Sequence, residues 1–297
     1  MSLLLGLCGL TFAPSFELTK TEFISAENLE INSTVPAGWL IILPLNSSTP
    51  LFHINGVPFT EIPQRDLQYG VASVYGGPLK ILRAQSFSEL AAFSGVFHSP
   101  VSTVLEKKIW VKKDQLNTGN ELRLPSSVMK KLKSAEEEKK QQDSRLLASA
   151  LKGDVMDFDP SCLKLPVENK KITSAFGRPR TLPSGRSYYH SGVDLRAWEG
   201  TPILNTKPGQ VVFAGHMIVP GNNVIVSHGG GLFSRYLHLS EIHVQTGQRL
   251  PAQAVVGLSG ATGRVEASHL HWEMIWKGQF ADPLLLLREW EQICDPK

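Results

Sequence analysis

The residue types in this chain that are best suited to chemistry are histidines, and most of them lie in its second half. Seven of the nine histidines fall between His190 and His271. Two short motifs bound this stretch, His190-Ser-Gly-Val-Asp194 at its start and His269-Leu-His271 at its end. Imidazole nitrogens and carboxylate oxygens are common ligands of Zn²⁺. The crowding therefore indicates a metal site.

Backbone periodicity brings the side chains of each motif together. On a strand, His269 and His271 point to the same face, while Leu270 between them points into the core. The four-residue offset from His190 to Asp194 puts both side chains on one face of a strand or of a helix. The intervening Gly-Val favours the extended form.

Two histidines and one aspartate leave a fourth tetrahedral position for water. This open arrangement is typical of catalytic zinc, whereas structural zinc is normally closed by four protein ligands. Taken singly, each histidine is better explained as a core or loop residue. Taken together, in a glycine-rich β context, they favour a zinc site.

The elements that must position these residues are strands. From residue 157 onward, strand-like runs alternate with turns that contain glycine, at 203–204, 210–213, 224–226, 233–237, 255–258 and 269–275. This spacing predicts a compact, mostly antiparallel β domain over 157–297, with a short terminal helix at 284–290.

The first half of the chain predicts a separate, smaller β domain. Short apolar runs at 29–31, 39–45, 51–54, 71–75, 79–82 and 109–111 are separated by turn residues. Strands at this spacing suggest a small antiparallel β-sandwich over 17–112. Asn55-Gly56 predicts a tight hairpin, because this pair tolerates the positive φ angles of a type I′ turn.

A charged segment joins the two predicted domains within a linker at 113–156. Residues 128–151 are rich in helix formers and lack glycine and proline. Glu136 and Lys140 are i,i+4 neighbours, so the charges are expected on a solvated helix face. The overall prediction is therefore a mainly β protein with a helical linker.

Composition limits the partners. The chain has 297 residues, a net charge of +3 and a sequence pI near 8.7. This mild basicity argues against nucleic acid as the main partner and is compatible with an anionic polymer such as cell wall. No run reaches the roughly 18 apolar residues of a membrane span. Of the three cysteines, Cys162 and Cys294 bracket the C-terminal domain and could pair if the protein is exported.

The first residues resemble an export signal. Residues 1–16 look like the hydrophobic region of a secretory signal peptide, although no Lys or Arg precedes the apolar run. The alternative is an apolar first strand that packs in the core.

Many blocks of the second half resemble one family. Over about 172–285 the chain is similar to the LytM/lysostaphin-type zinc peptidases, family M23, and the upstream segment looks like members with an N-terminal β domain. The blocks that carry the likeness are His190-x-x-x-Asp194, Gly200-Thr-Pro-Ile, Gly209-x-Val-x-x-Ala-Gly215, Gly221-Asn-x-Val, Ser227-His-Gly229, Tyr236-Leu-His-Leu-Ser240, Val244-x-x-Gly247, Gly257-x-x-Gly260-x-Thr-Gly263 and His269-Leu-His271.

The resemblance implies a zinc endopeptidase that cuts cross-links or stem peptides of bacterial peptidoglycan, in the periplasm or cell envelope. By motif, His190, Asp194 and His271 would bind one Zn²⁺ per chain, and His238 and His269 would be the catalytic histidines. We expect His269 to be the general base, because it shares a strand face with His271. His238 would orient or stabilise the tetrahedral oxyanion.

Other residues receive weaker assignments. Asn222 and Tyr236 are candidates for substrate contact, although a turn asparagine and a strand tyrosine also have plain structural explanations. His216, His228 and His243 are expected to be bystanders. Tyr188-Tyr189 stands where the family commonly has Ser-Pro, a departure that bears on loop shape and substrate preference.

A second functional class remains open at this point. A catalytically inactive relative could bind peptidoglycan or activate a cell-wall amidase, but such relatives usually lack one or more zinc ligands, and all three are present here. The N-terminal domain could act as an inhibitory lid over the cleft or as a recognition module for a partner.

Overall fold

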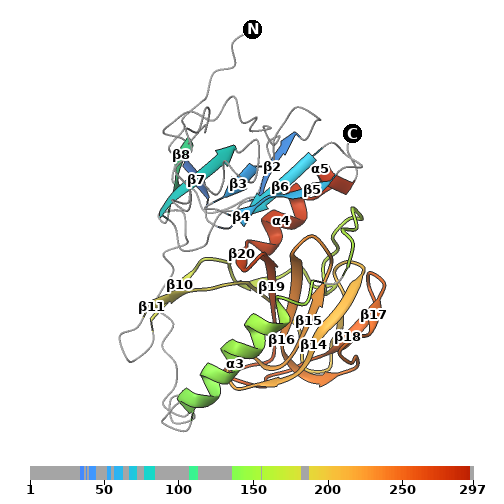
Figure 1. The fold of residues 1–297 in the computed structure, drawn as a ribbon. Helices are drawn as coiled ribbons and strands as arrows, with labels where there is room; N and C mark the ends of the chain where they lie inside the picture. Colours follow the sequence, from blue (N-terminus) through green and yellow to red (C-terminus); the bar gives the residue numbers. More distant parts are fainter. Residues whose placement is uncertain are drawn as a thin grey trace.

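The protein is mainly β (Figure 1). The computed structural model describes residues 34–36, 38, 40–44, 52–54, 57–62, 67–71, 77–83, 107–112, 136–154, 156–181 and 187–294. The predicted leader at 1–16, the strand expected at 29–31, the hairpin pair 55–56 and the first part of the predicted helix, up to residue 135, lie outside the described residues. No helix within the described ranges is both long and apolar enough to cross a membrane.

The N-terminal strands form two sheets. A five-stranded sheet has the order β1-β8-β7-β3-β4, in which only β1 and β8 are paired in parallel, and a three-stranded sheet has the order β2-β6-β5. The bounds are β1 Thr34–Pro36, β2 Leu40–Pro44, β3 Phe52–Ile54, β4 Val57–Pro58, β5 Thr60–Ile62, β6 Leu67–Val71, β7 Gly77–Arg83 and β8 Lys107–Lys112.

Three of these strands differ from the sequence prediction. β1 and β5 are not anticipated, and β6 ends at Val71, where a strand was expected to begin. β5 and β6 contain polar residues that are buried, Thr60 at 6% exposed and Gln68 at 0%. A search for apolar runs misses such strands, because their polar side chains are satisfied inside the protein.

The C-terminal half is built on a ten-stranded sheet in which the described strands pair antiparallel. Its main path is β17-β14-β15-β16-β19-β12-β9, with β13, β18 and β20 paired beside it, and β10 and β11 form a separate hairpin. The bounds are β9 Ile172–Ser174, β10 Pro179–Thr181, β11 Ser187–Tyr189, β12 Val193–Leu195, β13 Pro202–Leu204, β14 Gly209–Met217, β15 Gly221–Ser227, β16 Leu232–Ile242, β17 Arg249–Leu250, β18 Val255–Ser259, β19 Leu270–Trp276 and β20 Gln279–Ala281.

Helix α3 (Glu136–Ala150) covers part of this sheet, as the green helix of Figure 1 shows. Ala150 and the partly buried Leu147 pack against Ile225, Phe233 and Ile275, while most of the helix stays exposed. The Asp143 carboxylate accepts a hydrogen bond of 2.7 Å from the backbone N–H of Ile218. The helix therefore also anchors the turn between β14 and β15.

The N-terminal sheets and the C-terminal half share one hydrophobic core at β5 and β6. Thr60 donates from Oγ1 to the carbonyl of Gly230 at 2.5 Å and accepts from the Trp276 indole at 2.9 Å. The rings of Tyr69 and Trp290 meet edge to face, with centroids 5.1 Å apart. The described part of the N-terminal region is therefore packed against the C-terminal half, and the division at residues 112 and 157 stays a prediction.

The C-terminus is fastened to the start of its domain. Helices α4 (Pro283–Glu289) and α5 (Glu291–Cys294) occupy the region where the sequence predicts a terminal helix. The Asp282 side chain caps α4 by accepting from the N–H groups of Leu284 and Leu285. Cys162 and Cys294 form a disulfide across 132 residues of sequence. The pairing that the sequence left open is therefore present.

Candidate metal centre

The candidate ligands are brought together by sheet register. Asp194 on β12 lies opposite His271 on β19 and opposite Ser174 on β9. Directly opposed residues of antiparallel strands point to the same face of the sheet. A row of side chains across three strands thus carries an aspartate and a histidine, and His190 joins it from the residues just before β12.

A glycine makes room for this convergence. A Cβ atom at Gly192 would collide with the backbone oxygen of Trp272 and lie 2.9 Å from Nε2 of His271. The segment between the two ligands of the first motif can therefore pass close to β19 only because residue 192 has no side chain.

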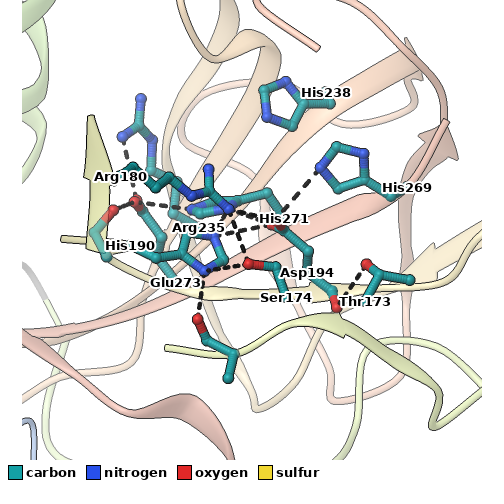
Figure 2. A network of polar contacts seen from close by, with 12 residues as sticks. Thr173, Ser174, Arg180, His190, Asp194, Arg235, His238, His269, His271 and Glu273 are labelled. Carbon is teal, nitrogen blue, oxygen red and sulfur yellow. Dashed lines mark hydrogen bonds and ion pairs between the residues drawn. The ribbon is translucent and has the colours of Figure 1, made fainter. Parts of the chain in front are cut away.

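Three ligand atoms converge on one point (Figure 2). Nε2 of His190 lies 3.0 Å from Oδ1 of Asp194 and 2.9 Å from Nδ1 of His271, and that Nδ1 lies 2.7 Å from the same Oδ1. All three side chains are buried, with 1% of His190, 7% of Asp194 and 6% of His271 exposed.

In His190 and His271, the ring nitrogen that points away from the convergence point has a hydrogen-bond acceptor. This acceptor determines which nitrogen carries the proton and which has a lone pair. Nδ1 of His190 lies 2.7 Å from the carbonyl of Ala175, so it carries the proton and donates. Nε2 of His271 lies 3.1 Å from Oε1 of Glu273 and donates in the same way. When neither inner nitrogen carries a second proton, two nitrogen lone pairs and a carboxylate oxygen face one another within hydrogen-bond distance. Such a donor set repels itself unless a cation lies between its members, and it fits Zn²⁺.

Glu273 is a member of the site that the sequence reasoning did not single out. Its Oε1 also accepts from the Ser191 hydroxyl at 2.5 Å, and its Oε2 lies 3.3 Å from the Arg235 guanidinium. Glu273 is only 3% exposed, so its carboxylate is buried with these three partners and holds His271 in a fixed orientation. Its position two residues after His271 on the same strand was the signal that could have revealed it.

Arg180 holds the second oxygen of the aspartate. Its guanidinium donates to Oδ2 of Asp194 at 2.8 Å and to the Ser174 hydroxyl at 3.1 Å. Arg180 comes from β10, which belongs to the separate hairpin. Because Arg180 takes Oδ2, Oδ1 is left to face the two imidazoles.

The electrostatic environment favours positive charge at the point of convergence. Burial would raise the pKa of Asp194, but its hydrogen bonds with His190 and His271 hold it well below the usual range. Burial would likewise lower the pKa of His271, yet its hydrogen bonds with Asp194 and Glu273 raise it to about 9. The pKa of His190 is lowered, chiefly by burial.

His238 and His269 lie side by side next to this trio, with ring centroids 5.1 Å apart (Figure 2). Nδ1 of His269 lies 2.9 Å from the carbonyl of Ala267, and its Nε2 is 3.6 Å from Oδ1 of Asp194. Nδ1 of His238 lies 2.9 Å from the carbonyl of Thr262. Each ring therefore presents an unprotonated Nε2. Burial, followed by the charges of His271 and His269, lowers the pKa of His238 to about 3.

The backbone of His238 is unusual for a strand residue. Its φ angle is +64°, in the left-handed region, and the strand pairing of β16 is irregular on both sides of it. Its N–H donates to the carbonyl of Pro220 at 2.9 Å instead of to a neighbouring strand. A histidine in this conformation costs free energy of the order of 1–3 kcal/mol, which is typical of functional positions.

The two weaker substrate candidates lie elsewhere. Tyr236 is fully buried, and its hydroxyl accepts from the backbone N–H of Thr206 at 2.7 Å. Asn222 bonds to Thr262 through its backbone and lies 3.0 Å from His216 through its side chain. Neither residue lines the cleft over the metal centre. The structure thus places both in supporting positions.

The three remaining histidines of the stretch also lie outside the cleft. His228 directly precedes the glycine turn between β15 and β16, as the sequence suggested, and it is completely buried with its ring bonded within the core. The side chain of His243 is 40% exposed beside Glu241.

A cleft of about 460 Å³ opens over the trio and over His238 and His269. Its described lining comes from β9, β10, β11, β12, β16, β19 and the loops at 219–220 and 264–269. None of the described N-terminal residues contributes to it. The arrangement can bind a metal ion beside two further imidazoles that line the same cleft.

Comparisons with known proteins agree with this geometry. Residues 188–283 match the model of peptidase family M23. The chain is 40% identical over 118 residues to the peptidoglycan DD-endopeptidase ShyA of Vibrio cholerae, covering 39% of this chain and 27% of the relative. It is 33% identical over 120 residues to the DD-carboxypeptidase/endopeptidase Mpg of Neisseria meningitidis, covering 40% and 27%. The chain thus spans just over a quarter of the length of these relatives.

A solved structure shares the fold over more of the chain. A protein from Pseudomonas aeruginosa described as a candidate M23 peptidase superposes with a TM-score of 0.54, covering 85% of this chain and 94% of the other at 23% identity. The family model spans both ligand motifs, His238 and His269. Residues 188–283 of this chain are therefore similar in sequence to peptidase family M23.

Proposed function

We propose that this protein is a zinc-dependent endopeptidase that hydrolyses peptide bonds of bacterial peptidoglycan, in cross-links or stem peptides. One observation carries the proposal. Two imidazole lone pairs and one carboxylate oxygen converge within 4.8 Å of one another on the floor of a cleft, inside an M23 domain. Two relatives, one named as a peptidoglycan DD-endopeptidase and one as a DD-carboxypeptidase/endopeptidase, each match about two fifths of the chain.

His190, Asp194 and His271 would hold one zinc ion per chain. Zinc bound there supplies a Lewis acid, which polarises a carbonyl and lowers the pKa of a coordinated water toward ~7. Three protein ligands leave a position open for the reactants, as in other catalytic zinc sites. Arg180 and Glu273 keep the ligand atoms aimed at this position through their bonds to Asp194 and His271.

His269 takes the role of general base. Its Nδ1 donates to Ala267, so the unprotonated Nε2 faces the metal site and can accept a proton from the attacking water. His269 is less buried than its neighbour, with 19% of its side chain exposed. Once protonated, it can pass the proton to the amine that leaves.

His238 acts beside it as an orienting group. Because its Nδ1 proton is committed to Thr262, neutral His238 offers Nε2 as an acceptor for the reacting water. Because the pKa of His238 is lowered to about 3, we favour the orienting role over stabilisation of the oxyanion, which would need a protonated Nε2.

The disulfide supports a location outside the cytoplasm. Cys162–Cys294 is of the kind that persists in oxidising compartments, and a peptidoglycan substrate lies there too. We therefore place the protein in the periplasm or cell envelope. None of the described N-terminal residues lines the cleft, so an N-terminal region that regulates the enzyme would have to do so without contributing to this lining.

The experiment that tests the proposal incubates purified muropeptide dimers with the zinc-loaded protein and identifies the products by mass spectrometry. We expect zinc-dependent cleavage of a peptide bond, which His269→Ala reduces by about 10²–10⁴-fold while zinc stays bound. Full turnover of zinc-loaded His269→Ala would remove it from the role of base. If the wild-type protein binds zinc and peptidoglycan but cleaves nothing, the role of a non-enzymatic wall-binding protein or amidase activator would be favoured instead.

A further inference from the structure

An arginine and a tyrosine face each other in the cleft, beside the metal centre. Tyr188 comes from β11 and Arg264 from the loop between β18 and β19, and both line the cleft. An Nη of Arg264 donates to the Tyr188 hydroxyl at 3.1 Å, and the guanidinium carbon lies 5.7 Å from the centre of the tyrosine ring. The pair connects two walls that are 76 residues apart in sequence.

Two other arginines of the cleft are paired with carboxylates. Arg180 binds the Asp194 carboxylate at 2.8 Å, and Arg235 binds Glu273 at 3.3 Å. In the described part of the chain, no ion pair joins Arg264 to a carboxylate, and Glu266, which also lines the cleft, is exposed to solvent. Arg264 therefore brings to the cleft a positive charge that is not held in an ion pair.

We propose that Arg264, held in place by Tyr188, binds a carboxylate group of the peptide substrate and makes the enzyme prefer acidic peptides. This inference rests on the proposed function. A guanidinium has five N–H donors, of which Tyr188 uses one, so two parallel donors remain for a carboxylate. Peptidoglycan stem peptides supply such groups, because they contain acidic residues with more than one carboxyl group. A carboxyl group that is not used in a peptide link remains as a free carboxylate.

The position of Arg264 is prepared before substrate binds. Its backbone N–H donates to the carbonyl of Val219 at 3.0 Å, and Gly263 before it has a φ angle of +81° and packs against Gly221. The aromatic ring fixes the plane of the guanidinium through a cation–π contact. A side chain that is already ordered loses less conformational entropy on binding.

The chemistry favours an arginine over a lysine at this place. A lysine would keep the charge but could not form two parallel hydrogen bonds in a fixed plane or stack on Tyr188 in the same way. Arg264→Lys should therefore retain only part of the preference.

Two muropeptide dimers test the proposal. They have the same cross-link and differ only in that the free side-chain carboxylates of one are carboxamides in the other. For the zinc-loaded wild-type protein we expect kcat/KM to be about tenfold higher for the carboxylate form, the effect of one charge-assisted hydrogen-bonded contact, mostly through KM. Arg264→Gln should abolish this preference by lowering kcat/KM for the carboxylate form to that for the carboxamide form, and Tyr188→Phe should reduce the preference in part.

The matched control is Arg249→Gln, which removes the same charge from an exposed residue of β17 outside the cleft. It should keep the tenfold preference. Equal kcat/KM of the wild-type protein for the two dimers, or a preference that persists in Arg264→Gln, would overturn the proposal while leaving the endopeptidase activity in place.

A binding measurement separates this inference from the activity. Calorimetric titration of the same two dimers into the zinc-loaded His269→Ala protein, with and without Arg264→Gln, reads the preference without turnover. If no dimer is cleaved by the wild-type protein, the proposed function fails, and the calorimetric difference still decides whether Arg264 recognises a carboxylate. Equal affinities for both dimers would overturn that recognition.

Discussion

Two clusters of buried polar side chains in the C-terminal half use the same residue types in different ways. The cleft cluster consists of His190, Asp194, His271 and Glu273, and the core cluster of Lys207, His228 and Ser234. His228 has an uncharged partner at each nitrogen, the carbonyl of Pro208 at 2.8 Å and the Ser234 hydroxyl at 2.7 Å. His271 instead lies between two carboxylates, with Oδ1 of Asp194 at 2.7 Å and Oε1 of Glu273 at 3.1 Å.

The electrostatic consequences are opposite. Burial lowers the pKa of His228 to about 4, so it is neutral at neutral pH. His271 is as deeply enclosed, but its hydrogen bonds with two carboxylates outweigh burial and raise its pKa to about 9. Burial alone therefore makes a histidine an inert part of the core. Converging carboxylates create a place that favours positive charge, and this is what marks a candidate metal site.

The largest expected effect comes from removing His271. His271→Ala deletes one of three candidate ligands, so we expect bound zinc to fall from one per chain to almost none. Cleavage should fall by more than the roughly 10–100-fold that the loss of an outer partner of a metal ligand costs. Zinc content by mass spectrometry and muropeptide turnover measure the two effects. The control is His228→Asn, which should keep both zinc and turnover; a His271→Ala protein that retained one zinc would contradict the ligand assignment.

The next effect concerns the core cluster and its disulfide. The carbonyl of Ser161, next to Cys162, accepts from the Lys207 ammonium at 2.5 Å and from the Trp290 indole at 3.1 Å. Replacing both Cys162 and Cys294 by serine removes the covalent link between the start of the C-terminal half and helix α5, next to this cluster. We expect the free energy of unfolding to fall by about 2–5 kcal/mol. Denaturant titration measures this loss. At 25 °C, zinc content and turnover should be unchanged, and a parallel loss of zinc would show that the two clusters are coupled.

Sequence alone could reveal the ligands of the cleft cluster because local spacing decides where they point. His190 and Asp194, and likewise His271 and its neighbour His269, are related by even offsets in extended chain. The same rule could also have identified Glu273, because it follows His271 by two residues and therefore points to the same face of the strand. Arg180 and Arg235 could not be found in this way, because they enter from β10 and β16 and only the sheet arrangement brings them near.

Other features depend on tertiary packing that no local pattern encodes. The left-handed backbone of His238 interrupts a run that looks like an ordinary strand, and it is stabilised by bonds to Pro220 and Thr262. Thr60 is a polar residue in an otherwise unremarkable segment, yet it joins the N-terminal sheets to Trp276 and Gly230. The disulfide pairs residues 132 positions apart, a distance at which sequence only allows the pairing.

The pH dependence of stability tests the pKa of His228. Its folded pKa of about 4 lies below the unfolded value of 6.5, so between these values the unfolded chain binds more protons. Its contribution is complete above pH 6.5 and is lost as pH falls toward 4, by roughly 3 kcal/mol. Denaturant titrations from pH 7 to 4 should therefore show a steeper loss of stability for the wild-type protein than for His228→Asn. Equal slopes would mean that His228 is not held neutral by burial.

The smallest effect we expect concerns Glu273. It is the most selective test of the difference between the cleft cluster and the core cluster. Glu273→Gln keeps the shape of the side chain and an oxygen that can accept from Nε2 of His271, but it removes the charge that lies 3.1 Å away. The affinity for zinc, measured by competition with a chelator, should fall about 10–100-fold. Turnover at saturating zinc should fall much less, because all three ligands remain.

The matched control for Glu273 is Ser191→Ala. It removes only the hydroxyl that donates to Oε1 of Glu273 at 2.5 Å and keeps the carboxylate charge. Its effect on zinc affinity should therefore be smaller than that of Glu273→Gln. If both variants bound zinc as tightly as the wild-type protein, the carboxylate would serve only to pair Arg235. The contrast with His228, whose partners are uncharged, would then rest on Asp194 alone.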